Sequence, residues 1–453
     1  MYPNIAIVGS GYLGTTHAAC MAELGFDVVA VDVDLVRIAR LRRGDPPFFE
    51  PHLSELLRRH LATGRLRFTT SMAEAAAFGD CFFLCVGTPQ REDGLAADLS
   101  QLYRAVGELV PLLRNDALLV GKSTVPVGTA AALAELAARL ASPTVEVAWN
   151  PEFLREGCGI QDTLNPDRLV LGVTSPEAEK VLRQVYARLI EAGVPLVVTD
   201  LASAELVKCA ANAFLATKIS FINLIAELSE GAGADVLAVA EALGYDSRIG
   251  HRSLHPGLGF GGGCLPKDLR ALIAQSAALA GADSVALLRA VDGINLRCRS
   301  RLVEAAIEEC GGSVRGRRIG VLGAAFKPFT DDVRDSPALD VARRLRHAGA
   351  DVQVYDPAAN RTGKAAAPEL EFTDTAEDAL RWTDLVLHLT EWPEFRKLDP
   401  QALWWLVNEP RFLDGRNALS AEQWRSAGWT FRALGGPTAA TSDAVMASAA
   451  RLA

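Results

Sequence analysis

The sequence predicts an α/β protein in which two doubly wound domains are joined by a long central helix and a helical dimerisation region. Three observations support this prediction. An apolar strand, a glycine-rich loop, a helix and a second strand that ends in an acid follow one another over residues 4–32. A related pattern, in which one strand is followed by a second strand that ends in an acid, returns over residues 318–356. Between them, residues 202–230 place apolar side chains on almost every face of a helix.

Composition and charge exclude several classes of protein. The chain of 453 residues has room for about two to four domains. Its net charge of −9 does not supply the basic surface that nucleic acid requires. The eight cysteines include no CxxC pair, so neither a disulfide framework nor a metal site is expected. No uninterrupted apolar run reaches the ~18 residues of a membrane span. We expect a cytoplasmic protein without nucleic acid or membrane partners.

The first element is a dinucleotide-binding fingerprint in its required context. The strand at 4–8 leads into GSGYLG, and the second strand, residues 26–32, ends in an acid. Such glycines let the backbone approach a pyrophosphate at a helix N-terminus, and the acid accepts hydrogen bonds from the ribose. A carboxylate repels a 2′-phosphate, which favours NAD over NADP, although a nearby arginine can accommodate that phosphate. The candidate cofactor residues of this Rossmann-like domain are Gly9, Gly11, Tyr12, Leu13, Gly14, Asp32 and Arg37.

Three later strands, at 80–86, 117–121 and 145–149, each end in polar residues. Ligands of a doubly wound sheet lie at the carboxyl ends of its strands, so Thr88 and Thr124 are candidate cofactor contacts, with a plain turn as the alternative at Thr88. Gly121-Lys122-Ser123-Thr124 lacks the first glycine of a phosphate-binding loop, which excludes a nucleoside triphosphatase. The segment 150–157, NPEFLREG, is a candidate site or, alternatively, a solvated helix start.

The central helix carries two polar residues, Lys208 and Asn212, which are four positions apart and share one face. Buried polar groups need partners, so these two belong either to a structural network or to a ligand site. A long buried helix between two α/β domains is also a natural dimer core. We therefore expect a homodimer, with domains at 1–200, 201–300 and 315–453, and a further helix over 269–299.

The stretch 259–268, GFGGGCLPKD, combines close backbone approach with a thiol. A neighbouring cation or base can favour the thiolate of Cys264, and Lys267 and Asp268 are near in sequence. The alternative is a glycine-rich turn with a small buried cysteine.

The C-terminal pattern differs from the first one in its loop, which is GAAFKP over 323–328. Lys327 beside an aromatic suits the phosphates or base of a nucleotide better than a dinucleotide's pyrophosphate. Further strands are expected at 384–390 and 412–416, and Arg416 ends the last one. For His388 we expect no chemical role.

Together these motifs resemble the UDP-glucose/GDP-mannose 6-dehydrogenase family, in particular its UDP-glucose branch. The matching segments run in family order as GSGYLG, GTP (87–89), KSTVPVGT (122–129), NPEFLREG (150–157), ELVKCAANAF (205–214), GFGGGCLPKD (259–268), AFKPFTDDVRDSP (325–337) and DGRN (414–417). The resemblance implies an N-terminal NAD domain, a central dimerising helix and a C-terminal nucleotide-sugar domain. His52 and Leu224 stand where relatives often have Gly and Glu.

The resemblance also implies a four-electron oxidation of a sugar C6 alcohol to a carboxylate with two NAD⁺. Cys264 matches the nucleophile, which forms a thiohemiacetal and then a thioester. Lys208 would stabilise the oxyanions with help from Asn212, and Asp268 would transfer protons. Thr124 and Glu152 would position the alcohol and the water.

The remaining contacts are implied by the same resemblance. Glu156, Lys267 and Arg334 match NAD contacts, and Arg248 matches an arginine that reaches the substrate from the other subunit. The substrate set comprises Glu152, Phe153, Leu154, Arg155, Glu156, Lys208, Asn212, Arg248, Ser253, Leu254, His255, Pro256, Gly257, Phe260, Gly261, Lys327 and Arg416.

Residues 165–168, NPDR, and the segment NAFLATKISFIN favour UDP-glucose, which would be oxidised to UDP-glucuronate. The alternatives are a UDP-N-acetylhexosamine or GDP-mannose as substrate. Two further hypotheses remain open: a two-electron NAD-dependent dehydrogenase without a thioester, and a catalytically silent NAD-binding scaffold.

Overall fold

The structure is a computed structural model that describes residues 3–113, 116–140 and 145–436. The chain divides into two compact units, each described here by itself. The first unit comprises Met1–Ala211 and Arg270–Leu279, and the second comprises Asn212–Leu269 and Ala280–Ala453. The division into three domains stays a prediction.

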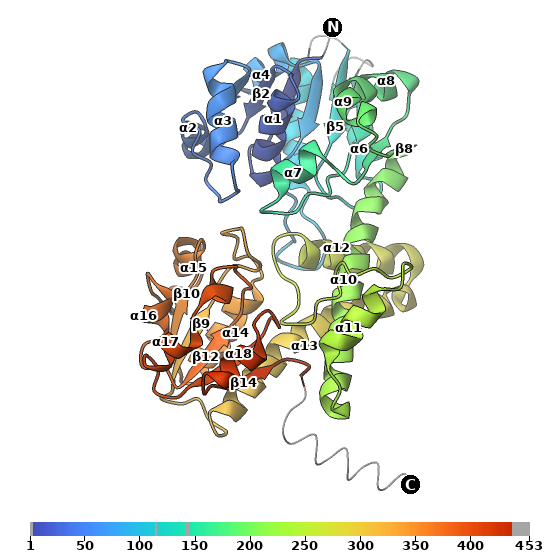
Figure 1. The fold of residues 1–453 in the computed structure, drawn as a ribbon. Helices are drawn as coiled ribbons and strands as arrows, with labels where there is room; N and C mark the ends of the chain where they lie inside the picture. The colour runs from blue at the N-terminus through green and yellow to red at the C-terminus, as the bar shows by residue number, and fades with distance from the viewer. Residues whose placement is uncertain (1–2, 114–115, 141–144, 437–453) are drawn as a thin grey trace. The chain divides into compact units, whose positions relative to one another are not determined.

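The first unit is built on an eight-stranded sheet in the order β3-β2-β1-β4-β5-β6-β7-β8 (Figure 1). Neighbouring strands are parallel except for β6 and β7, which pair antiparallel at Trp149 and Gly172. The strands are β1 (Ile5–Val8), β2 (Val28–Val31), β3 (Leu66–Thr69), β4 (Cys81–Leu84), β5 (Ala117–Gly121), β6 (Val145–Trp149), β7 (Leu169–Gly172) and β8 (Leu196–Thr199).

Helices cover both faces of this sheet because successive strand residues point to opposite faces. Ile5 and Ile7 belong to a core with α1, α3 and α8, whereas Ala6 and Val8 belong to a core with α4, α5 and α6. The helices are α1 (Tyr12–Glu23), α2 (Leu35–Leu41), α3 (Leu53–Ala62), α4 (Met72–Phe78), α5 (Ser100–Leu109), η1 (Val110–Leu112), α6 (Thr129–Leu140), α7 (Gly159–Leu164), α8 (Pro176–Val185) and α9 (Ala187–Glu191). His52 precedes α3 with φ of +63°, a left-handed conformation that favours the glycine expected there.

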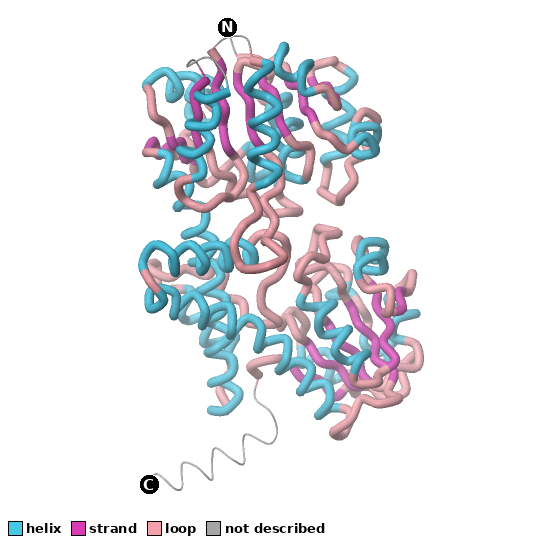
Figure 2. The backbone as a smooth tube through the Cα atoms, turned by 180° about the vertical axis from the view of Figure 1, so that it is seen from behind, coloured by secondary structure: helices cyan, strands magenta, loops and turns pink. Residues whose placement is uncertain are grey.

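The second unit contains a six-stranded parallel sheet in the order β11-β10-β9-β12-β13-β14, and its strands lie between helices in Figure 2. Its strands are β9 (Arg318–Leu322), β10 (Asp351–Tyr355), β11 (Glu371–Phe372), β12 (Leu385–His388), β13 (Arg411–Asp414) and β14 (Thr430–Ala433). One core joins it to α13 (Ala286–Glu309), α14 (Pro337–His347) and α15 (Asn360–Ala366). The opposite core contains α16 (Ala376–Leu380), η3 (Phe395–Lys397), α17 (Pro400–Trp404) and α18 (Ala421–Ser426).

The long central helix is α10 (Leu201–Ala232), and α11 (Val236–Gly244) follows it. Residues 269–299 are helical as expected, with one break: α12 (Leu265–Ala280) ends at Gly281, which has φ of +87°. A short η2 (Ala282–Val285) then leads into α13.

The prediction that α10 is largely buried is wrong for a single chain. Phe214, Phe221 and Leu228 are 66%, 48% and 61% exposed, and they recur every seven residues. Within the described part of the chain, α10 is the one helix whose length and composition suit a membrane span, with a mean hydropathy of 1.4 over a window that is 44% buried. Two of its buried side chains nevertheless make hydrogen bonds within the protein: Ser220 Oγ donates to Val291 O, and Asn223 Oδ1 accepts from Gly257 N. Core helices of water-soluble proteins pass the same test of length and composition.

Candidate functional site

The turn between β1 and α1 has the geometry of a pyrophosphate site. Gly9 has φ of +94°, and a Cβ at Gly14 would lie 1.8 Å from the Gly9 carbonyl oxygen, so no larger residue fits. Helix α1 starts directly after this turn, and its N-cap, Gly11, offers no side-chain cap. The first N–H groups of α1 therefore have no side-chain acceptor, which is the arrangement that binds an anion at a helix N-terminus.

Asp32 lies at the end of β2, where the sequence places the ribose acid. Its Oδ2 accepts from Ser10 N at 2.7 Å and from Arg37 Nη1 at 2.9 Å, while Oδ1 accepts from Asp34 N at 3.0 Å. Arg37 is thus paired with the carboxylate. Its charge is partly neutralised there, so it is a weaker partner for a 2′-phosphate than an unpaired arginine would be.

Glu50 is a residue of this region that sequence analysis missed. It is buried, and its carboxylate accepts from Tyr12 OH and Gly157 N at 2.6 Å each and from Gly159 N at 2.7 Å. Burial first, then the charge of Glu50, raises the pKa of Tyr12 above its usual value. Glu50 thereby ties the dinucleotide loop to segment 150–157. Only the fold brings these segments together, so no local motif could have identified it.

Hydroxyl groups join the ends of β4 and β5. Thr88 Oγ1 donates to Thr124 O at 2.7 Å, and Ser123 Oγ donates to Val86 O at 2.6 Å. Lys122 is buried beside them and donates to Asn150 Oδ1 at 2.8 Å. Burial lowers the pKa of Lys122 to about 8.

Segment 150–157 follows β6 and holds a buried ion pair. Glu152 Oε1 lies 3.1 Å from Lys208 Nζ, so the polar partner predicted for Lys208 is a carboxylate. Glu152 Oε2 also accepts from Leu154 N at 2.8 Å, and Glu156 is buried. Arg155 instead points to Asp162, with Nη2 at 2.6 Å from Oδ1.

In the second unit, the glycine-rich loop ends at an exposed thiol. Cys264 is exposed and is the N-cap of α12, whose positive end favours a thiolate. By contrast, burial raises the pKa of Cys85 to about 12 and that of Cys298 to about 11. The alternative of a small buried cysteine at position 264 is therefore wrong.

Asp268 lies one turn into α12 and is completely buried. Its Oδ2 accepts from Asn212 Nδ2 and its Oδ1 from Lys267 Nζ, both at 2.6 Å. The predicted partners Asn212, Lys267 and Asp268 thus meet directly behind the thiol-bearing loop. Arg334 is also close to this loop, because a Cβ at Gly263 would lie 2.3 Å from its guanidinium carbon.

The end of β13 places Arg416 against the same loop. Its guanidinium donates to Leu389 O, Gly259 O and Phe326 O at 2.7, 3.0 and 3.1 Å. These three carbonyls leave part of its donor capacity for a ligand. His388 pairs with Asp414 at 2.8 Å, and Asp414 also accepts from Arg416 N, so His388 helps to shape this turn.

The other predicted substrate residues of the second unit divide by exposure. Leu254, Pro256, Gly257, Phe260 and Gly261 are buried, and His255 Nε2 lies 2.9 Å from Arg416 O. Ser253 has φ of +65°, and Lys327 Nζ lies 5.8 Å from the centre of the Phe326 ring. Arg248 is exposed and pairs with Asp246.

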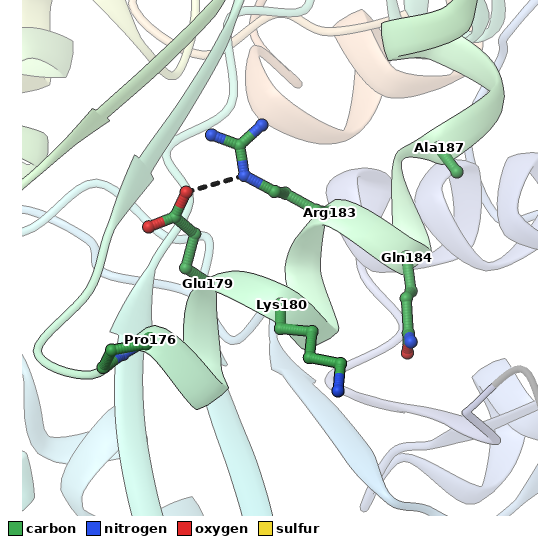
Figure 3. A pocket seen from close by; sticks show the side chains of 6 residues that line it. All are labelled: Pro176, Glu179, Lys180, Arg183, Gln184 and Ala187. Atoms are coloured by element: carbon green, nitrogen blue, oxygen red, sulfur yellow. Dashed lines mark hydrogen bonds and ion pairs between the residues drawn. The ribbon is translucent and has the colours of Figure 1, made fainter.

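A surface hollow beside α8 coincides with none of the predicted sites (Figure 3). It is lined by Pro176, Glu179, Lys180, Arg183, Gln184 and Ala187, and Glu179 pairs with Arg183 at 2.6 Å. Across the described residues, no three His, Cys, Asp or Glu side chains gather as a metal site.

A dinucleotide turn, a buried lysine–carboxylate pair and an exposed thiol at a helix N-terminus define a dehydrogenase. Residues 3–190 match the NAD-binding domain, residues 202–297 the central domain and residues 320–421 the UDP-binding domain of one family. The chain belongs to this family, the UDP-glucose/GDP-mannose dehydrogenases.

Individual relatives agree along nearly the whole chain. A UDP-glucose 6-dehydrogenase of Bacillus subtilis is 39% identical, covering 98% of this chain and 100% of the relative. One of Pseudomonas aeruginosa is 40% identical, covering 96% and 98%. The solved UDP-glucose dehydrogenase of Pyrobaculum islandicum is 37% identical with a TM-score of 0.89, covering 96% and 98%. The predicted family, the fold and an NAD-dependent nucleotide-sugar dehydrogenase are thus confirmed.

Proposed function

We propose that the protein oxidises UDP-glucose at C6 to UDP-glucuronate in two successive two-electron steps with two NAD⁺. The exposed Cys264 at the N-terminus of α12 carries this proposal, because a thiol is what a second oxidation without release of an aldehyde requires. The UDP-binding match over 320–421 and the relatives called UDP-glucose 6-dehydrogenases support the choice of substrate.

In the first oxidation, the C6 alcohol would give its hydride to NAD⁺ and its proton to a water molecule positioned by Thr124 and Glu152, which leaves an aldehyde. Bound NAD⁺ supplies the hydride acceptor in both steps. Lys208, held by Glu152, stabilises the developing alkoxide, because a fixed cation in a dry site needs no reorganisation. Thr124 and Glu152 position the alcohol.

In the second oxidation, Cys264 Sγ bonds to the aldehyde carbon, and the oxyanion that forms is stabilised by Lys208. Loss of the second hydride converts this thiohemiacetal into a thioester. Asp268, assisted by Asn212, takes a proton from water, which attacks the thioester carbon and releases the carboxylate and the thiol. The remaining contacts implied by the family resemblance stay predictions.

We propose NAD as the cofactor in place of NADP. Asp32 presents a carboxylate at the end of β2, and Arg37 is drawn to it at 2.9 Å. The anionic acid would repel a 2′-phosphate, while its oxygens accept from ribose hydroxyls.

A homodimer is proposed from the exposed seam on α10. Phe214, Phe221 and Leu228 follow a seven-residue spacing, which a second copy of the helix can cover. Light scattering should give twice the chain mass, and Phe221→Glu should yield monomers. A monomeric wild-type protein would contradict this part of the proposal.

The decisive experiment is the yield of NADH per nucleotide sugar, measured against UDP-glucose, GDP-mannose, UDP-N-acetylglucosamine and UDP-N-acetylmannosamine. We expect about two NADH per UDP-glucose and little turnover of the others. A yield of one indicates a two-electron dehydrogenase, and no NADH with any sugar indicates a silent scaffold. Cys264→Ser should abolish the second oxidation, and full turnover by that variant would remove Cys264 from the mechanism.

A further inference from the structure

The turn after β6 gathers three cations around the side chains of three neighbouring residues. Asn150 accepts from Lys122 at 2.8 Å, and Glu152 pairs with Lys208 at 3.1 Å. The third cation is Arg168, whose guanidinium carbon lies 3.7 Å from the centre of the Phe153 ring. Arg168 has no role in the mechanism above.

Phe153 contacts two cations at once. Besides Arg168, the ammonium of Lys208 lies 5.7 Å from the centre of the same ring. The π face of an aromatic ring attracts cations, and a planar guanidinium also stacks on it. The ring is therefore a physical link between Arg168 and the lysine to which the proposed function assigns the oxyanions.

The antiparallel strand β7 explains why Arg168 reaches this turn. Trp149 pairs with Gly172, and Asn150 Nδ2 donates to Val170 O at 2.8 Å. The segment after β6 and the segment before β7 therefore continue side by side. Extending this register places Arg168 opposite Phe153. In a parallel pair, the residue before a strand would lie at the opposite edge of the sheet.

The contact between Arg168 and the Phe153 ring does not result from an ion pair that holds Arg168 in place. Among the residues that the structure describes, no carboxylate lies within ion-pairing distance of Arg168. Phe153 is half-buried and Lys208 is 4% exposed, so the contact forms where water is largely excluded. Desolvation strengthens an attraction between a cation and a ring.

We propose that Arg168 is a positioning residue that fixes the ring of Phe153, so that the ring and Glu152 together hold Lys208. This inference rests on the proposed function only through the role of Lys208. Without the ring, the ammonium of Lys208 loses one of the contacts that fix its position relative to the oxyanion.

The test is a double-mutant cycle of Arg168→Met and Phe153→Leu, measured as single-turnover rates of the first oxidation. Arg168→Met keeps a long, unbranched side chain but removes the positively charged, planar guanidinium group. We expect it to lower kcat about tenfold, with KM for NAD⁺ unchanged, because one cation–ring contact is lost. In the Phe153→Leu background, the same change should cost less than about twofold, since the ring is already absent. Arg168→Lys should recover part of the rate.

The control is the second arginine–phenylalanine pair of the same unit, Arg67 over Phe78 at 5.1 Å. Arg67→Met should leave kcat unchanged. The proposal is overturned if Arg168→Met leaves kcat intact, or if the rate effects of Arg168→Met and Phe153→Leu simply multiply in the double variant. It is also overturned if kcat falls only in proportion to the fraction of folded protein.

A further variant separates this inference from the proposed function. Lys208→Met should abolish the first oxidation. If it does and Arg168→Met has no effect, only the positioning role of Arg168 fails. If Lys208→Met turns over normally, the role of Lys208 in the proposed function fails, and with it the inference.

Discussion

The two sheets share one strand order but finish the turn after their first strand in different ways. The order β3-β2-β1-β4-β5-β6 in the first unit corresponds to β11-β10-β9-β12-β13-β14 in the second. Gly9 and Gly323 occupy the same place, with φ of +94° and +109°. Gly9 N donates to Val31 O and Gly323 N donates to Tyr355 O, at 2.9 and 2.7 Å. Up to this glycine the two turns are equivalent.

The acids at the ends of β2 and β10 are used differently. Asp356 is 1% exposed, and its carboxylate accepts from the N–H groups of Ala324, Ala325, Ala358 and Ala359 and from the Trp392 indole. Asp32 accepts from Ser10 N, Asp34 N and the Arg37 side chain. Five donors saturate Asp356, so it has no capacity left for a ribose.

The helices that follow the two turns, α1 and α14, also differ in whether their N-terminal N–H groups have side-chain partners. Helix α1 begins at Tyr12, directly after the glycine turn, without a side-chain cap. Helix α14 begins only at Pro337, and the hydroxyl of its N-cap, Ser336, accepts from Leu339 N and donates to Ala324 O. The comparison teaches that topology fixes where a helix N-terminus and an acid lie, whereas their protein partners decide whether a dinucleotide can use them.

The largest predicted effect comes from filling the first turn. Gly14→Ala places a Cβ against the Gly9 carbonyl, and the backbone must move to relieve that contact. We expect NAD⁺ affinity to fall more than about 100-fold by calorimetry, together with about 2 kcal/mol of stability. Gly11→Ala, where a Cβ meets nothing within 4 Å, should fold normally. Equal NAD⁺ binding by Gly14→Ala and the wild type would refute the assignment of this turn.

A loss of stability without loss of NAD⁺ binding is predicted at the second acid, Asp356. Asp356→Asn turns an amide towards backbone N–H groups that need acceptors. We expect a loss of about 2 kcal/mol in the free energy of unfolding, measured in urea. Asp32→Asn should cost less stability, because only two backbone N–H groups donate to Asp32, and it should weaken NAD⁺ binding about tenfold. If the two substitutions had the same pattern of effects, the contrast between the turns would be wrong.

The two units should also respond to pH in different ranges, although stability rises with pH in both. The folded pKa of Lys122 is about 8, below its unfolded value of about 10.4, so the unfolded chain binds more protons between these values and stability rises with pH in that window. For Asp414, burial raises the pKa, but the charge and the hydrogen bond of His388 lower it by more, so the folded pKa lies below the usual value. The stability that Asp414 contributes is therefore lost as pH falls below about 4. Urea unfolding across pH measures both slopes. Lys122→Met should remove the rise in stability above pH 8, which is at most about 1.4 kcal/mol per pH unit, and leave the loss of stability below pH 4 unchanged.

Much of this molecule could be predicted because its motifs are local. The glycine turn and the acid Asp32 followed from spacing, and the need of Lys208 and Asn212 for polar partners followed from their expected burial, although the sequence did not identify those partners. Glu50 and Arg168 could not be found this way, since their contacts with segment 150–159 form only in the folded chain. The sequence indicated α10 as a dimer core but not which of its residues are exposed, because an apolar pattern does not distinguish burial within a chain from burial between two chains.

The contrast between Cys264 and the other cysteines has a practical use. Cys20, Cys81, Cys85, Cys209, Cys298 and Cys310 are buried, and Cys158 is half-buried, whereas Cys264 is exposed. A mild alkylating reagent should therefore react with the native protein first at one position. The number of labels bound per chain would then give the fraction of chains with a reactive Cys264. A preparation could be standardised in this way before any turnover is measured.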